Sequence, residues 1–572
     1  RFPVVDISPS IYFGGEWVAA KAVPNESIPV YATIFREGHD TFEAHALLFD
    51  PNGAMVERKP MRLLHPGSER YTADLTPRYY GTWHFAIEVF DAKGVKDQSE
   101  KFPIKAETER ALIGSWYEFF PRSEGAIKKA DGTLVSGNFK TAVKSLQRVA
   151  DMGFDILYIP PIHPIGVQFR KGKNNTTTAL PGDVGVPWGI GGKEGGHDAI
   201  HPDLGSLKDF QDFVAAAKKL NIEVALDLAL QCSPDHPWVK TNEEFFSKRA
   251  DGTIAYAENP PKKYQDIYPI NFDNDYPTLF NEVLRIVKHW IAQGIRAFRV
   301  DNPHTKPVHF WQELIAKVNA EFPDVIFLAE AFTKPSMMHA LGKAGFQQSY
   351  TYFTWRVGKH ELQEYGHEVS KTTSAFFRPN FWVNTPDILP FHLQSGNPAV
   401  FALRAVLAST MVPSWGMYAG YELYEHVPLA EGKEEYRDSE KYEIRIRDYE
   451  KARKNGMTLE PFIAILNKIR KENVALQRLR NLEFHHTNND SVIAYSKREG
   501  NNLILVVVNL DAVHAQEATV SWNMEILGFD GSFDVTDLLD SSTYTWHPHT
   551  YVRLNPARPE GRVAHVARVK LK

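Results

Sequence analysis

Three acidic residues follow apolar runs in the middle of the chain. Asp301 ends the run IRAFRVD, Glu330 ends VIFLAE, and Asp387 comes shortly after FFRPNFWVN. A charge after an apolar strand is common because strand ends meet solvent, but three such carboxylates could also meet at one site. Retaining transfer of a sugar unit requires two carboxylates flanking the anomeric carbon, one as nucleophile and the other as acid/base. We therefore expect Asp301 to be the nucleophile and Glu330 the acid/base.

Two further charged residues are suited to support this pair. Arg299 lies two residues before Asp301, so the two side chains share one face of a strand. A guanidinium this close favours the ionised carboxylate that a nucleophile needs, and we expect Arg299 to orient Asp301. Asp387 adds a third negative charge that could stabilise a cationic transition state or bind sugar hydroxyls. Its structural alternative is a loop cap.

The elements that must position these residues alternate between apolar strands and amphipathic helices. Stretches such as SLKDFQDFVAAAKKLN and TLFNEVLRIVKHWIAQG have apolar residues at helical spacings of three and four. The expected strands are residues 113–120, 155–162, 224–230, 295–301, 325–330, 348–353, 376–384 and 413–420. Eight strand–helix units predict a (β/α)8 TIM barrel of the α/β class, in which reacting groups come from the C-terminal ends of the strands.

Short strands separated by turn residues flank the barrel on both sides. We expect an N-terminal antiparallel β-sandwich at residues 1–106, the catalytic barrel at 107–484 and a C-terminal antiparallel β-sandwich at 485–572. Residues 163–205, after the second barrel strand, are polar, glycine-rich and too long for an ordinary loop. They form either an inserted lid subdomain or a disordered linker.

Bulk composition excludes several classes of function. The 572 residues are 43% hydrophobic with a formal net charge of -5, so no basic excess attracts nucleic acid. No apolar run approaches the roughly 18 residues of a membrane-spanning helix. The single cysteine, Cys232, cannot form an internal disulfide, which predicts a cytoplasmic protein.

Several motifs resemble the α-amylase superfamily. They are LDLALQC on the third strand, FRVDNPHTK on the fourth, FLAEAF on the fifth and NTPDIL on the seventh. More specifically, the runs SWYEFFPRSEGA, RKGKNNT, EGGHDAIHP, QCSPDHPW, NPPKKYQDIYPI, FQQSYTYFTWR and DSEKY resemble the α-1,4-glucan:maltose-1-phosphate maltosyltransferases. Gln231-Cys232 stands where most amylases have Asn-His, which disfavours a plain starch hydrolase. The likeness runs over nearly the whole chain.

The resemblance implies a donor, an acceptor and a set of binding residues. The donor is α-maltose 1-phosphate, and the acceptor is an α-1,4-glucan or maltooligosaccharide; no cofactor and no metal is implied. The maltosyl site would be lined by Lys171, Asn175, Gln231, Lys262, Tyr264 and Lys441, with Asn259 and Asn302 close to the leaving group. The resemblance also implies a homodimer, although family members build theirs with a helical insertion before SWYEFF that this chain lacks.

Two alternatives remain open at this point. An α-glucan hydrolase or 4-α-glucanotransferase could use the same three carboxylates with sugar as the leaving group. A non-catalytic glucan-binding scaffold would be expected to have lost a carboxylate, and none is lost here. Because Cys232 follows Gln231, we also expect it close to the maltosyl site, where bulky thiol reagents that reach it would inhibit and bound donor would protect.

Overall fold

Eight parallel strands form the centre of the molecule. The computed structural model describes residues 2–37, 41–259, 262–557 and 562–571. The central strands are β13 (Gly114–Glu118), β16 (Ile156–Ile159), β17 (Glu223–Leu228), β22 (Ala297–Asp301), β23 (Ile326–Glu330), β24 (Gln348–Ser349), β25 (Asn380–Trp382) and β26 (Ser414–Tyr418). Their order is β24-β23-β22-β17-β16-β13-β26-β25, and a parallel bridge from Ser349 to Pro379 closes the sheet into a barrel. The predicted barrel is confirmed.

Helices cover the outside of the barrel, so its strands are buried on both faces. The helices are α1 (Phe139–Ala142), α2 (Leu146–Asp151), α3 (Leu207–Lys219), α5 (Tyr276–Ala292), α6 (Val308–Glu321), α7 (Pro335–Ala344), α8 (Lys359–His367), α9 (Pro398–Met411) and α11 (Glu460–Glu472). Ser206 caps α3 by accepting from the Asp209 amide, and Asp275 caps α5 in the same way. Trp290 on α5 is buried against the barrel.

A β-sandwich that is antiparallel except for the parallel pair β4 and β12 precedes the barrel. Its strands are β1 (Val4–Ser8), β4 (Ala20–Ala22), β5 (Ile28–Ile34), β6 (Glu43–Phe49), β7 (Met55–Pro60), β8 (Arg62–Leu63), β9 (Arg70–Leu75), β10 (Gly81–Phe90), β11 (Lys96–Gln98) and β12 (Phe102–Ala106). One sheet has the order β1-β5-β9-β8, and the other runs β4-β12-β10-β6-β7 with β11 beside β10. Apolar residues such as Val30, Trp83 and Phe85 form the core between them.

A second antiparallel sandwich follows the barrel. It contains β27 (Leu482–Thr487), β28 (Val492–Glu499), β29 (Asn502–Asn509), β30 (Gln516–Ser521), β31 (Phe533–Asp537), β32 (Thr543–Trp546), β33 (His549–Leu554) and β34 (Ala564–Val569). β27 pairs with β28 through His485 and with β30 from His486 onward, so this strand passes from one layer to the other. The predicted fold class, a barrel flanked by two sandwiches, is confirmed.

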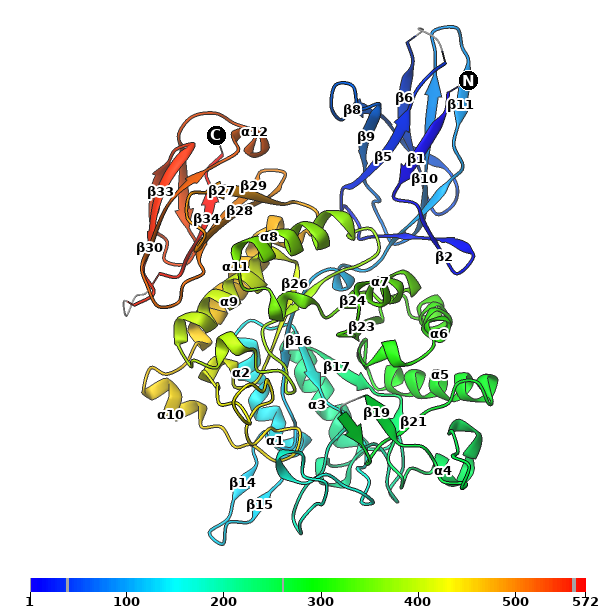
Figure 1. Cartoon of the computed structure of the whole chain (residues 1–572), viewed down its shortest axis with the longest axis vertical. Helices are drawn as coiled ribbons and strands as arrows, with labels where there is room; N and C mark the ends of the chain where they lie inside the picture. Colours follow the sequence, from blue (N-terminus) through cyan, green and yellow to red (C-terminus); the bar gives the residue numbers. More distant parts are fainter. Residues whose placement is uncertain (1, 38–40, 260–261, 558–561, 572) are drawn as a thin grey trace.

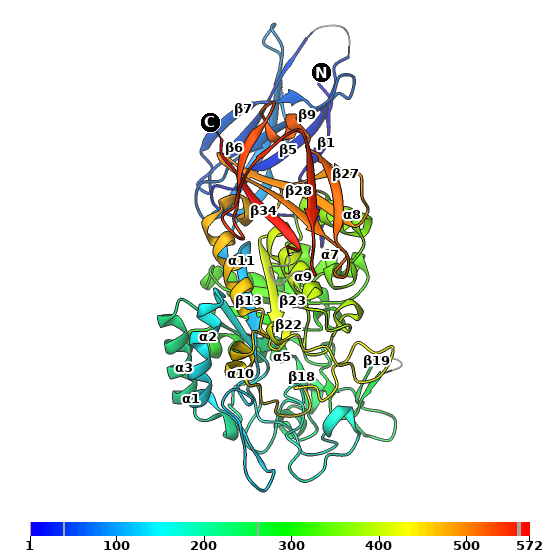
Figure 2. The same ribbon diagram turned by 90° about the vertical axis from the view of Figure 1, so that its left-hand side faces the viewer.

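Both sandwiches lie at one end of the barrel, and the long loops that follow the strands lie at the other (Figure 1, Figure 2). The loop hairpins β14–β15 (Ile127–Lys128, Leu134–Val135) and β19–β20 (Ala257–Asn259, Lys262–Tyr264) mark that opposite end. The strand ends that carry the candidate carboxylates therefore face away from the sandwiches. No helix in the described part of the chain is long and apolar enough to cross a membrane.

Residues 163–205 form a folded insertion over the loop end of the barrel. Ile165 bridges Ile190, and the Arg170 guanidinium donates to the carbonyl oxygens of Ile165, Gly166 and Asp183. Asp235, in the loop after β17, accepts from the amides of Val167 and Gln168 at 2.6 and 2.9 Å. These contacts match the inserted subdomain rather than the disordered linker.

Candidate active site

A single guanidinium joins the carboxylates at the centre of the site. Arg299 donates to Asp301 and to Asp227, both at 2.8 Å, and lies 3.3 Å from a carboxylate oxygen of Glu330. Its side chain is buried, because Tyr158 and Trp188 lie beside it. Arg299 therefore holds the predicted nucleophile, as the two-residue spacing indicates, and also holds the predicted acid/base.

Asp301 and Glu330 are paired in register on adjacent strands. Asp301 is the last residue of β22, Glu330 is the last of β23, and the two face each other in the parallel ladder. Neighbouring strands lie about 4.8 Å apart, and Arg299 contacts both carboxylates, so the two groups are close together, as the separation of about 5–5.5 Å in retaining enzymes requires. The backbone fold thus sets the geometry needed for double displacement.

Asn302 turns the chain sharply just after the nucleophile. Its backbone has φ of 42° and ψ of 54°, a left-handed conformation that asparagine tolerates better than most residues. This turn directs the Asn302 amide toward Glu330 at 3.4 Å, and the Asn302 side chain lies 3.5 Å from Asp301. Asn302 is therefore next to both predicted reacting carboxylates, and its position near the leaving group stays a prediction.

Burial gives Glu330 the protonation behaviour of an acid/base. Burial raises its pKa to about 7, Arg299 opposes this rise, and the charges of Asp301 and Asp387 add to it. A group with such a pKa can exist in both forms near neutral pH, and can therefore donate a proton in one step and accept one in the next.

The raised pKa predicts a pH-dependent stability difference for Glu330→Gln. Because the folded-state pKa is above the ordinary 4.5, the folded protein holds this proton more tightly than the unfolded chain does. Ionised Glu330 therefore destabilises the folded protein. This effect is absent in acid, grows as pH rises from about 4.5 to about 7, and is complete above that range. We expect Glu330→Gln to melt roughly 1–4 °C higher relative to the wild type at about pH 8 than at about pH 5. A melting difference that is equal at both pH values would contradict the assignment.

Four residues of the site, Asp227, Tyr158, Trp188 and Lys306, were missed by the sequence reasoning. Asp227, in the middle of β17, is the register partner of Arg299, and it accepts from Tyr158 at 2.5 Å and Trp188 at 3.1 Å. Burial raises the pKa of Asp227 to about 6, although Arg299 lowers it. Lys306 donates to the carbonyl oxygens of Asp301 and Asn302. A lone acid inside the apolar run VALDLAL was the available signal for Asp227.

Asp387 is paired with Lys441 at the rim of the site. The Lys441 ammonium lies 2.7 Å from an Asp387 oxygen and 5.3 Å from the centre of the Trp188 ring. Burial lowers the pKa of Lys441, but the opposing charge of Asp387 outweighs it and keeps the ammonium protonated. Asp387 and Lys441, which are far apart in the sequence and are both predicted to contact sugar, are therefore in direct contact.

The other predicted binding residues surround this pair in part. Lys171 is buried and donates to Gln265 at 3.0 Å, and Gln231 donates to the Trp188 carbonyl at 3.2 Å. The Tyr264 phenol contributes to the raised pKa of Lys441, which puts it near that ammonium. Asn175 is exposed and has a left-handed backbone with φ of 64°. Residues of the insertion and of three strand loops thus converge on one face.

Asn259 and Lys262 are the two predicted residues whose side chains cannot be placed. They pair with each other across the β19–β20 hairpin. Their side chains lie outside the described part of the chain. Their proximity to substrate stays a prediction.

Cys232 is fully buried in a cluster with two histidines. The ligand atoms of His197, Cys232 and His236 lie within 4.8 Å of one another, which is compact enough for a metal ion. The ring nitrogens already have protein partners, however. The backbone N–H of Trp238 donates to His236 Nδ1 at 3.1 Å. His236 Nε2 lies 3.0 Å from His197 Nδ1, and His197 Nε2 lies 2.8 Å from the Ala229 carbonyl oxygen. One tautomer chain satisfies these contacts without an ion.

Burial means that the condition for inhibition by bulky thiol reagents, access to Cys232, is not met in this structure, while its proximity to the maltosyl site stays a prediction. The Cys232 side chain has no exposed surface, and burial raises the thiol pKa well above its usual value. We expect a bulky maleimide to leave the native protein unlabelled and active, and to label it only after denaturation. Mass spectrometry before and after denaturation tests this. Rapid native labelling with loss of activity would show that the pocket opens to Cys232.

Comparisons with known proteins identify the family to which this chain belongs. The family model described as "Alpha-1,4-glucan:maltose-1-phosphate maltosyltransferase, domain N/S" matches residues 1–96, and "GLGE, C-terminal" matches residues 484–569. A Streptomyces coelicolor protein named alpha-1,4-glucan:maltose-1-phosphate maltosyltransferase 2 is 48% identical over 651 residues, covering 99% of this chain and 96% of that protein. The chain belongs to the α-1,4-glucan:maltose-1-phosphate maltosyltransferase family.

A further relative with the same name supports this family membership. The Mycobacterium tuberculosis (strain ATCC 25618 / H37Rv) protein of that name is 54% identical over 473 residues, covering 82% of this chain and 67% of that protein. The Streptomyces coelicolor alignment spans 651 positions, more than the 572 residues of this chain, so that relative has segments without a counterpart here. We expect such additional segments in relatives, because this chain lacks the family's helical insertion before SWYEFF.

Solved structures place the maltosyltransferase chain within the α-amylase fold. A cyclomaltodextrinase structure has a TM-score of 0.64 at 17% identity, covering 96% of this chain and 97% of that one. The α-amylase from Geobacillus thermoleovorans, complexed with acarbose, has a TM-score of 0.63 at 16% identity and covers 80% of this chain and 98% of its own. At these identities the likeness supports the fold alone.

Proposed function

We propose that the protein transfers a maltosyl unit from α-maltose 1-phosphate to the non-reducing end of an α-1,4-glucan or maltooligosaccharide, with retention and release of phosphate. The observation that carries this proposal is the in-register pair Asp301 and Glu330, bridged by Arg299. Membership of the maltosyltransferase family supplies the substrates. A non-catalytic scaffold is disfavoured because all three carboxylates are present at the barrel mouth.

The reaction proceeds in two displacements. Asp301 attacks the anomeric carbon, the bond to the phosphate oxygen breaks, and phosphate leaves with the bonding pair. The acceptor hydroxyl then attacks the same carbon, Glu330 takes its proton, and the Asp301 carboxylate is released. The ester removes the negative charge of Asp301, one of the causes of the raised Glu330 pKa. Glu330 is thereby ionised when a general base is needed.

The residues around the carboxylate pair bind the donor. Asp387 and Lys441 form one side of the pocket, where they bind sugar hydroxyls, and Asp387 stabilises the developing positive charge. Lys171, Asn175, Gln231, Lys262 and Tyr264 complete the maltosyl site. Asn302 lies beside both reacting carboxylates, and the resemblance to the family assigns Asn302 and Asn259 to the departing phosphate. The protein acts in the cytoplasm, for which the single cysteine is the support, and as a homodimer, for which the resemblance to the family is the support.

Phosphate release separates this function from its enzymatic alternatives. The wild-type protein is incubated with α-maltose 1-phosphate, with and without maltohexaose, and phosphate and glucan length are measured. We expect phosphate release that depends on the acceptor and is matched by elongation in steps of two glucose units. Glucan shortening or rearrangement without phosphate release would instead identify a hydrolase or 4-α-glucanotransferase.

A further inference from the structure

The loop that carries Lys441 has little regular structure to hold it in place. Between Tyr424 and Asp448 the described chain has no helix or strand. Lys441 nevertheless meets Asp387, which lies in the loop after the neighbouring strand β25, at 2.7 Å. Contacts from other segments must therefore fix the position of this ammonium.

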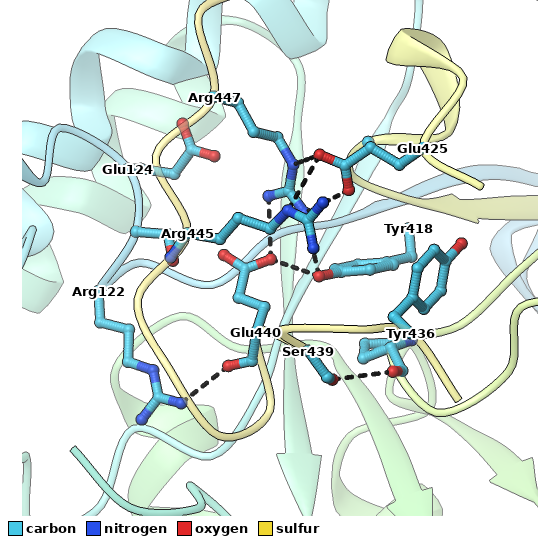
Figure 3. A network of polar contacts seen from close by, with 12 residues as sticks. Arg122, Glu124, Tyr418, Glu425, Tyr436, Ser439, Glu440, Arg445 and Arg447 are labelled. Atoms are coloured by element: carbon cyan, nitrogen blue, oxygen red, sulfur yellow. Dashed lines mark hydrogen bonds and ion pairs between the residues drawn. The ribbon is translucent and has the colours of Figure 1, made fainter. Parts of the chain in front are cut away.

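The residue before Lys441, Glu440, anchors the loop through its buried carboxylate. Its carboxylate is fully buried and accepts from the Tyr418 hydroxyl at 2.5 Å and from Arg447 at 2.9 Å (Figure 3). Arg447 also pairs with Glu425 at 2.9 Å, so the loop is tied to itself and to the end of β26. Glu440 points into the protein, and Lys441 is the next residue toward the pocket.

Arg122 holds the main chain of the same dipeptide. It follows β13, is 7% exposed, and donates one guanidinium nitrogen to the carbonyl oxygens of Glu440 and Lys441 at 2.8 and 3.1 Å (Figure 3). Its other terminal nitrogen donates to the Gly185 carbonyl at 2.9 Å. Gly185 belongs to the insertion that carries Lys171. One buried cation therefore joins two walls of the sugar pocket.

We propose that Arg122 is a positioning residue for donor binding, which fixes the insertion and the Lys441 loop relative to each other. The proposal rests on the proposed function. Arg122 has no contact with the reacting carboxylates, so it acts through Lys441 and the insertion. Removing its hydrogen bonds should loosen the pocket for the maltosyl group, while Asp301 keeps its own contact with Arg299.

Arg470 provides a matched control for a purely structural arginine. It is also buried and donates to main-chain carbonyls, those of Ser409, Val412, Pro413 and Gly114. Burial lowers the pKa of Arg122 and of Arg470 to about 10. Arg470, however, lies where β13 and β26 begin, at the end of the barrel away from the site. Losing either side chain costs buried hydrogen bonds, but only Arg122 joins pocket segments.

The test compares Arg122→Met, Arg122→Lys and Arg470→Met in the full chain. Melting temperature, kcat, and KM for α-maltose 1-phosphate and for maltohexaose are measured for each. We expect Arg122→Met to raise the donor KM by about 10- to 100-fold, the scale on which small misplacements act, with the acceptor KM little changed. Arg122→Lys should recover part of this loss. Arg470→Met should lower the melting temperature and leave both KM values unchanged.

The outcomes separate this inference from the proposed function. If the wild type releases no phosphate from the donor, the proposed function fails and this inference fails with it. If the wild type is active and the donor KM of Arg122→Met is unchanged, Arg122 is only structural and the inference is overturned. Should Arg122→Met not fold, the donor KM of Arg122→Lys decides: an increase supports positioning, and a wild-type value overturns it.

Discussion

Glu330→Gln should release about one phosphate per active site from α-maltose 1-phosphate and then stall. Phosphate departs as a stable anion and needs little help from a general acid, so Asp301 can still be maltosylated. The incoming sugar hydroxyl needs a general base, whose loss typically costs about 10²- to 10⁴-fold. Glutamine keeps the size of the side chain and its contact with the Asn302 amide but cannot take the proton. Rapid-quench measurement of phosphate detects the burst.

Two further measurements make this prediction specific. Azide attacks without needing a base, so it should restore turnover in Glu330→Gln and yield a maltosyl azide. Glu313→Gln, on α6 beside Tyr276, is the control and should turn over like the wild type. A uniform loss of both steps, with neither a burst nor azide rescue, would show that Glu330 is not the acid/base.

Asp301→Ala should lower turnover by about 10⁴-fold or more, the scale of losing a catalytic nucleophile. The fold should survive because Arg299 keeps two of its carboxylate partners, Asp227 and Glu330. Removing the Asp301 charge also removes one cause of the raised Glu330 pKa. Turnover and circular dichroism of the purified variant provide the check.

The control for this variant is Asp324→Ala, at the end of the barrel opposite the candidate site. Asp324 precedes β23 and pairs with Arg296 on the surface, so Asp324→Ala removes a carboxylate outside the pocket. It should keep wild-type turnover. An Asp301→Ala protein that is folded and retains more than a small fraction of activity would mean that another group attacks the anomeric carbon.

The central pair could be predicted because it depends on local patterns. Apolar runs of strand length ending in Asp301 and Glu330 are readable in the sequence, and consecutive strands of a barrel are neighbours. Once the barrel is inferred, the two strand ends must be adjacent. The in-register pairing of β22 and β23 follows the same logic.

Other parts of the site depend on contacts that no local pattern encodes. Asp227 reads as one polar residue in a buried strand, and its function appears only when Tyr158 and Trp188 are seen to donate to it. The Arg122 contact spans more than three hundred residues and uses main-chain carbonyls, which carry no sequence signal. The burial of Cys232 could not be predicted from its place after Gln231, because adjacency fixes chain position but not side-chain direction.

The most direct test of the account is intact-protein and peptide mass spectrometry of Glu330→Ala after incubation with α-maltosyl fluoride. Fluoride, like phosphate, leaves with little protonation, and the variant lacks the base needed to discharge the intermediate. The account predicts one added maltosyl unit per chain, attached to the peptide that contains Asp301, and its disappearance on adding azide. Absence of an adduct, or an adduct on any other residue, would contradict double displacement through Asp301.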